Sequence, residues 1–127
     1  MSEAFAPGLH LIEAYGGGQF TFAGMRRAGA ILATPKGVRA VDASDVADID
    51  EARLAPLFSE LMQTPGGVEF LAIGTGAAPR RLSRNVVDAL RAAGLRHEAM
   101  ATGPAARVYN VMAQEGRRVA ALLLPAP

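Results

Sequence analysis

The chain has 127 residues, of which half are hydrophobic and a fifth are charged, as in ordinary globular proteins. This length predicts a single domain over residues 1–127, with a loose segment at residues 1–8. No cysteine is present, which excludes disulfides, thiolate zinc sites, iron–sulfur clusters and cysteine nucleophiles. The start lacks the basic and apolar regions of a secretory signal, and the longest apolar stretch, Val119–Leu124, is too short to span a bilayer. We therefore expect a cytoplasmic protein without a membrane span.

The net charge of +1 conceals an asymmetry between the two parts of the chain. Residues 1–79 hold five Lys or Arg against nine Asp or Glu, whereas residues 80–127 hold eight Arg against three acids. The planar arginine side chain suits carboxylate and phosphate groups, but GC-rich codon usage produces the same bias, and we favour the codon explanation.

The first elements in chain order are predicted to be strands. Residues 10–15 can be extended, the three glycines 16–18 permit a tight turn, and residues 19–22 alternate at period two, which predicts a hairpin. A short strand follows at residues 25–27. The continuous apolar run 30–33 is typical of a buried strand, and residues 38–41 form another short strand.

A helix is predicted after the polar connection 42–50. Its apolar residues recur at i, i+3, i+4, i+7 and i+8 and so share one face: Leu54, Leu57, Phe58, Leu61 and Met62. Because Pro56 is tolerated only in the first turn, the helix is expected to begin nearer Leu54 than Glu51. A buried strand at residues 69–73 follows.

Two further helices alternate with strands in the rest of the chain. Ser83 is the predicted N-cap of a helix over residues 84–93, which Gly94 ends, and a strand follows at 95–100. Thr102 is the predicted N-cap of a third helix that Gly116 ends, before a last strand at 118–124. This alternation predicts an α/β fold with a mixed sheet covered by helices, preceded by an antiparallel N-terminal portion.

The first candidate site is the loop Gly74-Thr75-Gly76, which leads to Arg80, Arg81 and Arg84 at the start of a helix. Glycine-rich loops and helix starts present N–H groups to anions. The spacing matches neither nucleotide-binding fingerprint, because Pro79 stands where a third glycine is required. A plain turn with solvated arginines is the favoured interpretation, and an anion or carboxylate pocket is the alternative.

The second candidate site is the third helix, where Arg107, Asn110 and Gln114 form a polar stripe at i, i+3 and i+7. Such a stripe can line a site, bind a partner or simply face solvent, and the pattern alone does not separate these possibilities. Tyr109 is expected in the core.

Other chemistries find little support in the sequence. The acids between Asp42 and Glu51 lack the spacing and central glycine of a calcium loop, and two histidines are too few for a three-histidine zinc site. No serine lies in a G-x-S-x-G elbow, and Tyr109 is the only aromatic residue of the basic half. We therefore expect no metal, no cofactor, no nucleic-acid partner and no catalytic set.

Four segments together resemble a known family. They are Tyr15-Gly16-Gly17-Gly18-Gln19-Phe20, Ile73-Gly74-Thr75-Gly76, Met100-Ala101-Thr102-Gly103, and the stretch from Ala106 to Ala121. The chain is similar to the small uncharacterised domain found in the mitochondrial respiratory complex I assembly factor and in an adipogenesis-associated protein.

This resemblance implies a three-layer α/β fold with a central mixed sheet of about five strands, the last of them antiparallel, and no established enzymatic activity. The chain departs from the family pattern at Val108, where threonine is usual, and at Ala101, where aspartate is usual. A tryptophan common in the family is missing near Val41.

Two functional hypotheses follow. The first is a non-catalytic binding or assembly-factor-like protein that acts on a protein partner. The second is an enzyme or sensor for a small anion held by the Gly74–Gly76 loop. Both depend on the third helix and the threonine-containing turn packing beside each other and leaving guanidinium groups that point into one shared hollow. The predicted site residues are Gly74, Thr75, Gly76, Arg80, Thr102, Arg107, Asn110 and Arg118, with Arg117 beside them. The sequence assigns no oligomeric state.

Overall fold

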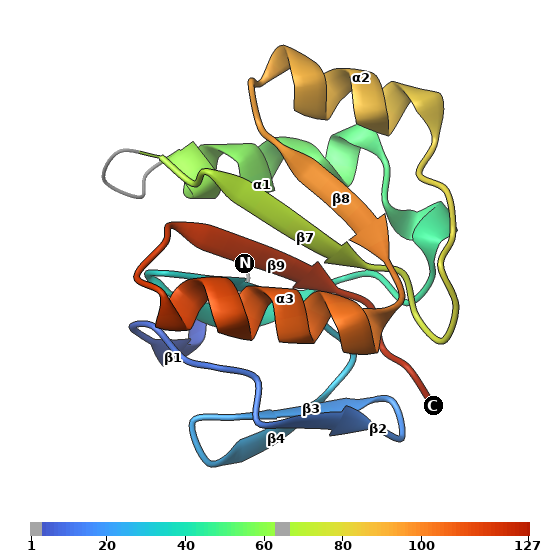
Figure 1. Ribbon diagram of the computed structural model, residues 1–127. Coiled ribbons are helices and arrows are strands. Elements are labelled where there is room, and N and C mark those ends of the chain that lie inside the picture. The colour runs from blue at the N-terminus through green and yellow to red at the C-terminus, as the bar shows by residue number, and fades with distance from the viewer. Residues whose placement is uncertain (1–3, 63–66) are drawn as a thin grey trace.

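The computed structural model describes residues 4–62 and 67–127, which form two sheets and three α-helices (Figure 1). The strands are β1 (Ala4–Pro7), β2 (Ala14–Gly16), β3 (Gln19–Phe22), β4 (Met25–Ala28), β5 (Ala30–Thr34), β6 (Gly37–Val41), β7 (Phe70–Gly74), β8 (His97–Met100) and β9 (Val119–Leu123). The helices are the short 3-10 turn η1 (Val46–Asp48), α1 (Glu51–Met62), α2 (Arg84–Ala92) and α3 (Thr102–Gln114).

The large sheet has the strand order β1-β6-β5-β9-β7-β8. Its last strand in the chain, β9, lies inside the sheet, antiparallel to β5 and parallel to β7. The predicted mixed sheet is therefore confirmed. It has six strands because residues 4–7, expected to belong to a loose segment, pair with β6 as strand β1.

Alternating side chains of the large sheet build a core on each of its faces. In β5 and β9, Ile31, Ala33 and Leu123 face α3, whereas Leu32 and Leu122 face α1 and α2. The predicted three-layer α/β arrangement follows from this alternation, since both faces are apolar and both are covered. No helix in the described ranges is long and apolar enough to cross a membrane.

The small sheet β2-β3-β4 lies in the same layer as α3. The predicted hairpin is confirmed, with Gly17 and Gly18 at positive φ in its turn. Phe20 and Phe22 alternate inward along β3 and are buried in the core cluster that includes Tyr109 of α3. The small sheet is thus anchored to α3 by aromatic side chains.

Helix α1 begins earlier than the sequence predicts. It starts at Glu51 because the Asp50 side chain caps it, accepting a hydrogen bond from the Arg53 N–H at 2.9 Å. Pro56 consequently lies inside the helix rather than in its first turn. Leu54, Leu57 and Leu61 are buried as predicted. The side chains of Phe58 and Met62 lie outside the described part of the structure.

Candidate functional site

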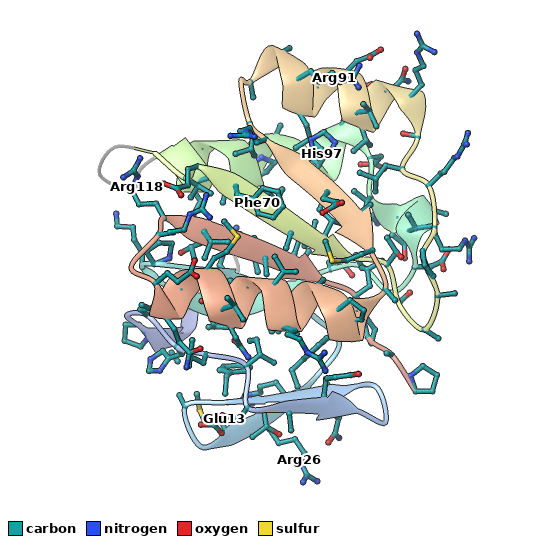
Figure 2. All side chains as sticks on the ribbon, viewed as in Figure 1. Glu13, Arg26, Phe70, Arg91, His97 and Arg118 are labelled. Carbon is teal, nitrogen blue, oxygen red and sulfur yellow. The ribbon has the colours of Figure 1, made fainter. Side chains whose placement is uncertain are left out.

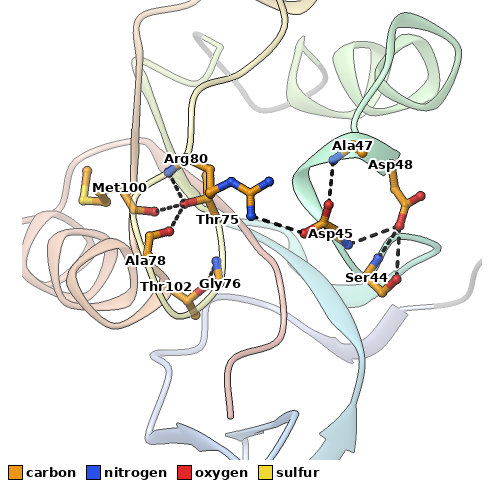
Figure 3. Close-up of polar contacts among 10 residues, drawn as sticks. All are labelled: Ser44, Asp45, Ala47, Asp48, Thr75, Gly76, Ala78, Arg80, Met100 and Thr102. Carbon is orange, nitrogen blue, oxygen red and sulfur yellow. Dashed lines mark hydrogen bonds and ion pairs between the residues drawn. The ribbon is translucent and has the colours of Figure 1, made fainter.

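The loop after β7 is organised by the Thr75 hydroxyl (Figure 3). Thr75 is only 5% exposed, and its Oγ1 lies 2.8 Å from the carbonyl oxygen of Ala78 and 3.1 Å from that of Met100. The same oxygen accepts a hydrogen bond of 3.0 Å from the Arg80 N–H. The side chain therefore closes its own loop and ties it to the end of β8.

Thr102 has a similar role. The prediction that Thr102 is the N-cap of α3 is wrong. Ala101 occupies the cap position without a side-chain hydrogen bond. The Thr102 hydroxyl, which is fully buried, instead accepts from the Gly76 N–H at 2.9 Å and donates to the Leu124 carbonyl at 2.7 Å. One hydroxyl therefore joins the β7 loop, the start of α3 and the end of β9.

Gly74 permits this close approach. A Cβ atom at Gly74 would lie 2.8 Å from the Thr102 Cα and 2.9 Å from its Oγ1, closer than Cβ atoms approach other atoms in proteins. We name the assembly of Gly74, Thr75, Gly76 and Thr102 the threonine joint. The N–H groups of Thr75 and Gly76 donate to Met100 and Thr102, so these donors are engaged inside the protein.

Arg80 lies on the chain segment that connects the threonine joint to α2. Its side chain lies 4.0 Å from a carboxylate oxygen of Asp45, an exposed ion pair of a kind that contributes little to stability. Together with Arg81 and Arg84 it lines a hollow of about 720 Å³ between α2 and β8. We call this cavity the α2–β8 hollow.

Two residues of α3, Tyr109 and Asn110, hold the N-terminal segment. Asn110 pairs with the backbone of Ile12 as another strand would: its Oδ1 accepts from the Ile12 N–H and its Nδ2 donates to the Ile12 carbonyl, both at 2.8 Å. The Tyr109 hydroxyl donates to the His10 carbonyl at 2.9 Å. These contacts fix residues 10–12 along α3, and Tyr109 lies in the core as predicted.

Burial raises the pKa of Tyr109 to about 12, from an ordinary value of 10.0. Neutral Tyr109 therefore stabilises the fold fully below about pH 10, and this stabilisation is lost as the pH rises toward about 12. We expect the free energy of unfolding to fall by up to about 1.4 kcal/mol per pH unit over that interval. Urea denaturation at about pH 9, 10 and 11 tests this, with Tyr109→Phe as the variant that lacks the contribution; identical slopes for the two proteins would contradict it.

A groove of about 480 Å³ runs between α3 and the chain leading into β2. Tyr15 and Glu13 line one side, and Gly103, Arg107 and Val111 line the other. A Cβ atom at Gly103 would lie 2.2 Å from the Tyr15 hydroxyl, so the missing side chain is what lets the aromatic ring lie against the helix. We call this the α3–β2 groove.

Arg117 and Arg118 lie away from both cavities, just before β9. Arg117 pairs with Glu69 at 2.7 Å, and Arg118 donates to the Gly67 carbonyl at 2.7 Å. The hydrogen bond from Arg117 holds the pKa of Glu69 below its usual value, although desolvation opposes the shift. The two arginines brace the turn into β7.

The predicted site residues therefore separate into distinct places. Gly74, Thr75, Gly76 and Thr102 meet in the threonine joint. The third helix and the threonine-containing turn do pack beside each other, through Gly76 and Thr102. The expectation that their guanidinium groups share one hollow is wrong, because Arg80 lines the α2–β8 hollow and Arg107 the α3–β2 groove on the opposite side of the sheet. Within residues 4–62 and 67–127, no three His, Asp or Glu side chains are grouped so as to hold a metal ion.

Sequence reasoning missed Tyr15, Gly103 and Val111 as groove residues. Tyr15 and Gly103 belong to segments that carry the family resemblance, but their contact joins parts of the chain far apart in sequence, which no local pattern reveals. Val111 follows Asn110 at the edge of the polar stripe. An apolar residue beside a polar stripe is the sequence signal that could have indicated it, and the structure shows that Val111 is exposed.

Residues 12–124 match the family model described as a protein of unknown function, DUF498/DUF598. The chain belongs to this family. An uncharacterized protein of Rhodobacter capsulatus is 36% identical over 91% of this chain and 85% of its own length. The mouse protein named NADH dehydrogenase [ubiquinone] 1 alpha subcomplex assembly factor 3 is 30% identical over 91% of this chain, which spans only 60% of that relative.

Similar solved structures confirm the fold. A Bartonella henselae protein described as an outer membrane protein superposes with a TM-score of 0.86 at 34% identity, covering 96% of this chain and 99% of its own. A Rhodopseudomonas palustris protein solved by NMR gives 0.81 at 35%, covering 98% and 91%. A Bordetella pertussis protein, described as an Mth938-like domain, gives 0.77 at 31%, covering 91% and 85%.

Proposed function

We propose that this chain is a non-catalytic binding protein of the assembly-factor kind, and that its protein partner occupies the α3–β2 groove. The observation that carries the proposal is the composition of that groove. Tyr15 is 51% exposed and Val111 47%, and they flank Arg107. The Arg107 guanidinium makes no hydrogen bond or ion pair with any residue in the described part of the chain. Tyrosine and arginine are the residue types that dominate binding energy at protein interfaces.

The groove is also held in shape before any partner arrives. Its two walls are joined by the paired hydrogen bonds between Asn110 and Ile12 and by the bond from Tyr109 to His10. A preformed surface loses little conformational entropy on binding, so more of the contact energy appears as affinity. The matching partner inserts an apolar side chain between Tyr15 and Val111 and presents a carboxylate to Arg107.

The relatives support the class of function rather than a specific partner. Several of them are named as assembly factors. The chain spans only 60% of the mouse relative, so that relative does not identify a partner for it. The alternative expected from the sequence, a small anion at the Gly74–Gly76 loop, has less support because the N–H groups of Thr75 and Gly76 are already bonded to Met100 and Thr102.

The test places a photo-crosslinking amino acid at Val111 and, as the control, at Arg26 on the far side of the small sheet. In cells of the native host, we expect a defined crosslinked protein from position 111 and not from position 26. Arg107→Glu should weaken binding of that protein at least about tenfold, and Gly103→Ala should weaken it too, because the added methyl displaces Tyr15.

The matched charge reversal Arg26→Glu should leave binding unchanged. The proposal is overturned if position 111 yields no crosslinked protein, or if the protein captured there binds Arg107→Glu as tightly as it binds the wild type.

A further inference from the structure

Strand β8 presents an open edge. In the described part of the chain it stands last in the strand order and pairs with β7 alone. The carbonyls of Arg96 and Met100 accept hydrogen bonds from the β7 side, from the N–H groups of Leu71 and Thr75. Because backbone groups alternate in direction along a strand, the N–H and C=O of His97 and Ala99 point away from β7. They form a ladder that another strand can continue.

The α2–β8 hollow lies directly beside this edge. Arg84, Val87, Asp88 and Arg91 recur at i, i+3, i+4 and i+7 and so present one face of α2 to the hollow. Arg80 and Arg81 complete its basic lining from the preceding loop. Figure 2 shows Arg91 on α2 and His97 on β8 together at one end of the molecule, with Arg26 at the other.

The charge of the hollow is predominantly positive. Four arginines line it against two acids, Asp88 and Glu98, and of the four only Arg80 makes an ion pair with another described residue. The half-buried side chains of Leu82, Val87 and Ala99 supply apolar surface between the charges. The lining therefore suits a ligand that carries acidic groups for the arginines and apolar groups that pack against Leu82, Val87 and Ala99.

We propose that the β8 edge and the α2–β8 hollow form a second binding site, which takes an extended acidic segment of a partner protein as an added strand. Backbone hydrogen bonds to His97 and Ala99 supply affinity, and the arginines select the sequence. The site lies on the opposite face of the large sheet from the α3–β2 groove and does not depend on the function proposed for that groove.

The pairing register of β8 predicts which side chains of the added strand are acidic. His97 and Ala99 pair with Leu71 and Ile73, which face α2, whereas Met100 packs in the core on the α3 side. Side chains of an added strand alternate in the same way. Every second residue of the segment therefore meets the arginines and carries a carboxylate, and the residues between them are apolar.

Charge argues against a second copy of this chain as the occupant. Symmetric pairing of two β8 edges would bring the same arginine-lined hollow of each copy toward the other. Like charges opposed across an interface disfavour association. An acidic segment from another protein is complementary to the hollow.

The probe is a fluorescein-labelled peptide in which glutamate alternates with valine and threonine, and its binding is measured by fluorescence anisotropy at low and at physiological salt. We expect saturable binding that weakens with salt, and at least about tenfold weaker binding to the double variant Arg84→Glu, Arg91→Glu. The control reversals Arg26→Glu and Arg107→Glu should bind the peptide as the wild type does. A peptide with lysine in place of glutamate should not bind.

Strand addition is tested separately from charge. Ala99→Pro removes an outward N–H, and two peptides N-methylated at alternate residues remove one or the other set of peptide donors. We expect weaker binding to Ala99→Pro, loss of binding for only one of the two methylated peptides, and slower amide exchange at His97 and Ala99 in the complex. If Ala99→Pro does not fold, the methylated peptides still test strand addition, because they are measured with the wild-type protein.

The proposal is overturned by equal binding of the lysine peptide, by equal binding of both methylated peptides, by absence of saturable binding, or by a dimer of this chain joined at β8.

Discussion

Thr102→Val should lower the free energy of unfolding by about 2–6 kcal/mol, since it leaves two groups without their partner. Valine has the shape of threonine but cannot accept from the Gly76 N–H or donate to the Leu124 carbonyl. Each such group left unsatisfied in the interior costs about 1–3 kcal/mol. Urea denaturation followed by circular dichroism measures the change. Stabilities of small domains amount to about 5–15 kcal/mol, so the loss is a large fraction of the total.

The matched control is Thr102→Ser, which keeps the hydroxyl and removes one methyl group. It should cost about 1 kcal/mol, the value of one buried methyl, and retain both hydrogen bonds. If the valine and serine variants are equally stable, the hydroxyl does not hold the threonine joint together and its geometry needs another explanation.

Asn110→Ala should destabilise the protein by about 1.5–3 kcal/mol, because it removes the two hydrogen bonds to the Ile12 backbone. The effect should be local as well as global. Amide exchange at Ile12 should accelerate much more than exchange in β5 or β9, because the pairing holds residues 10–12 and the large sheet does not depend on it. Two-dimensional NMR with hydrogen exchange measures both.

Gln114→Ala provides the comparison for Asn110→Ala. Gln114 lies one helical turn further along the same side of α3 and is exposed. Its replacement should change stability by no more than about 0.5 kcal/mol. Unchanged exchange at Ile12 in Asn110→Ala would show that other contacts hold the N-terminal segment in place.

Much of the fold could be predicted because its signals are local. The apolar run in β5, the period-two pattern in β3 and the Ser83 cap each act over a few residues, and each was confirmed. The start of α1 differs from the prediction because the Asp50 side chain caps the helix early and the helix holds Pro56 beyond its first turn, where the prediction did not allow it. Strand β1 was missed because its pairing with β6 depends on a distant partner.

The candidate site could be predicted only in part, for a related reason. The sequence singled out Thr102 and Asn110, but their roles depend on Leu124 and on Ile12, which lies 98 residues away. A helical period shows that polar residues share a face. It does not show whether their side chains form hydrogen bonds within the protein or remain available to a ligand. Arg80 and Arg107 likewise look similar in sequence and lie in different cavities.

The position of β9 inside the large sheet determines the order in which the molecule can be completed during its synthesis. Of the described strands, β9 leaves the ribosome last, yet it separates β5 from β7. Until then, the nascent chain holds two incomplete sheets whose facing edges expose unpaired backbone groups and apolar side chains. Such edges favour aggregation, so the pairing of β9 with both β5 and β7 is the step that removes them.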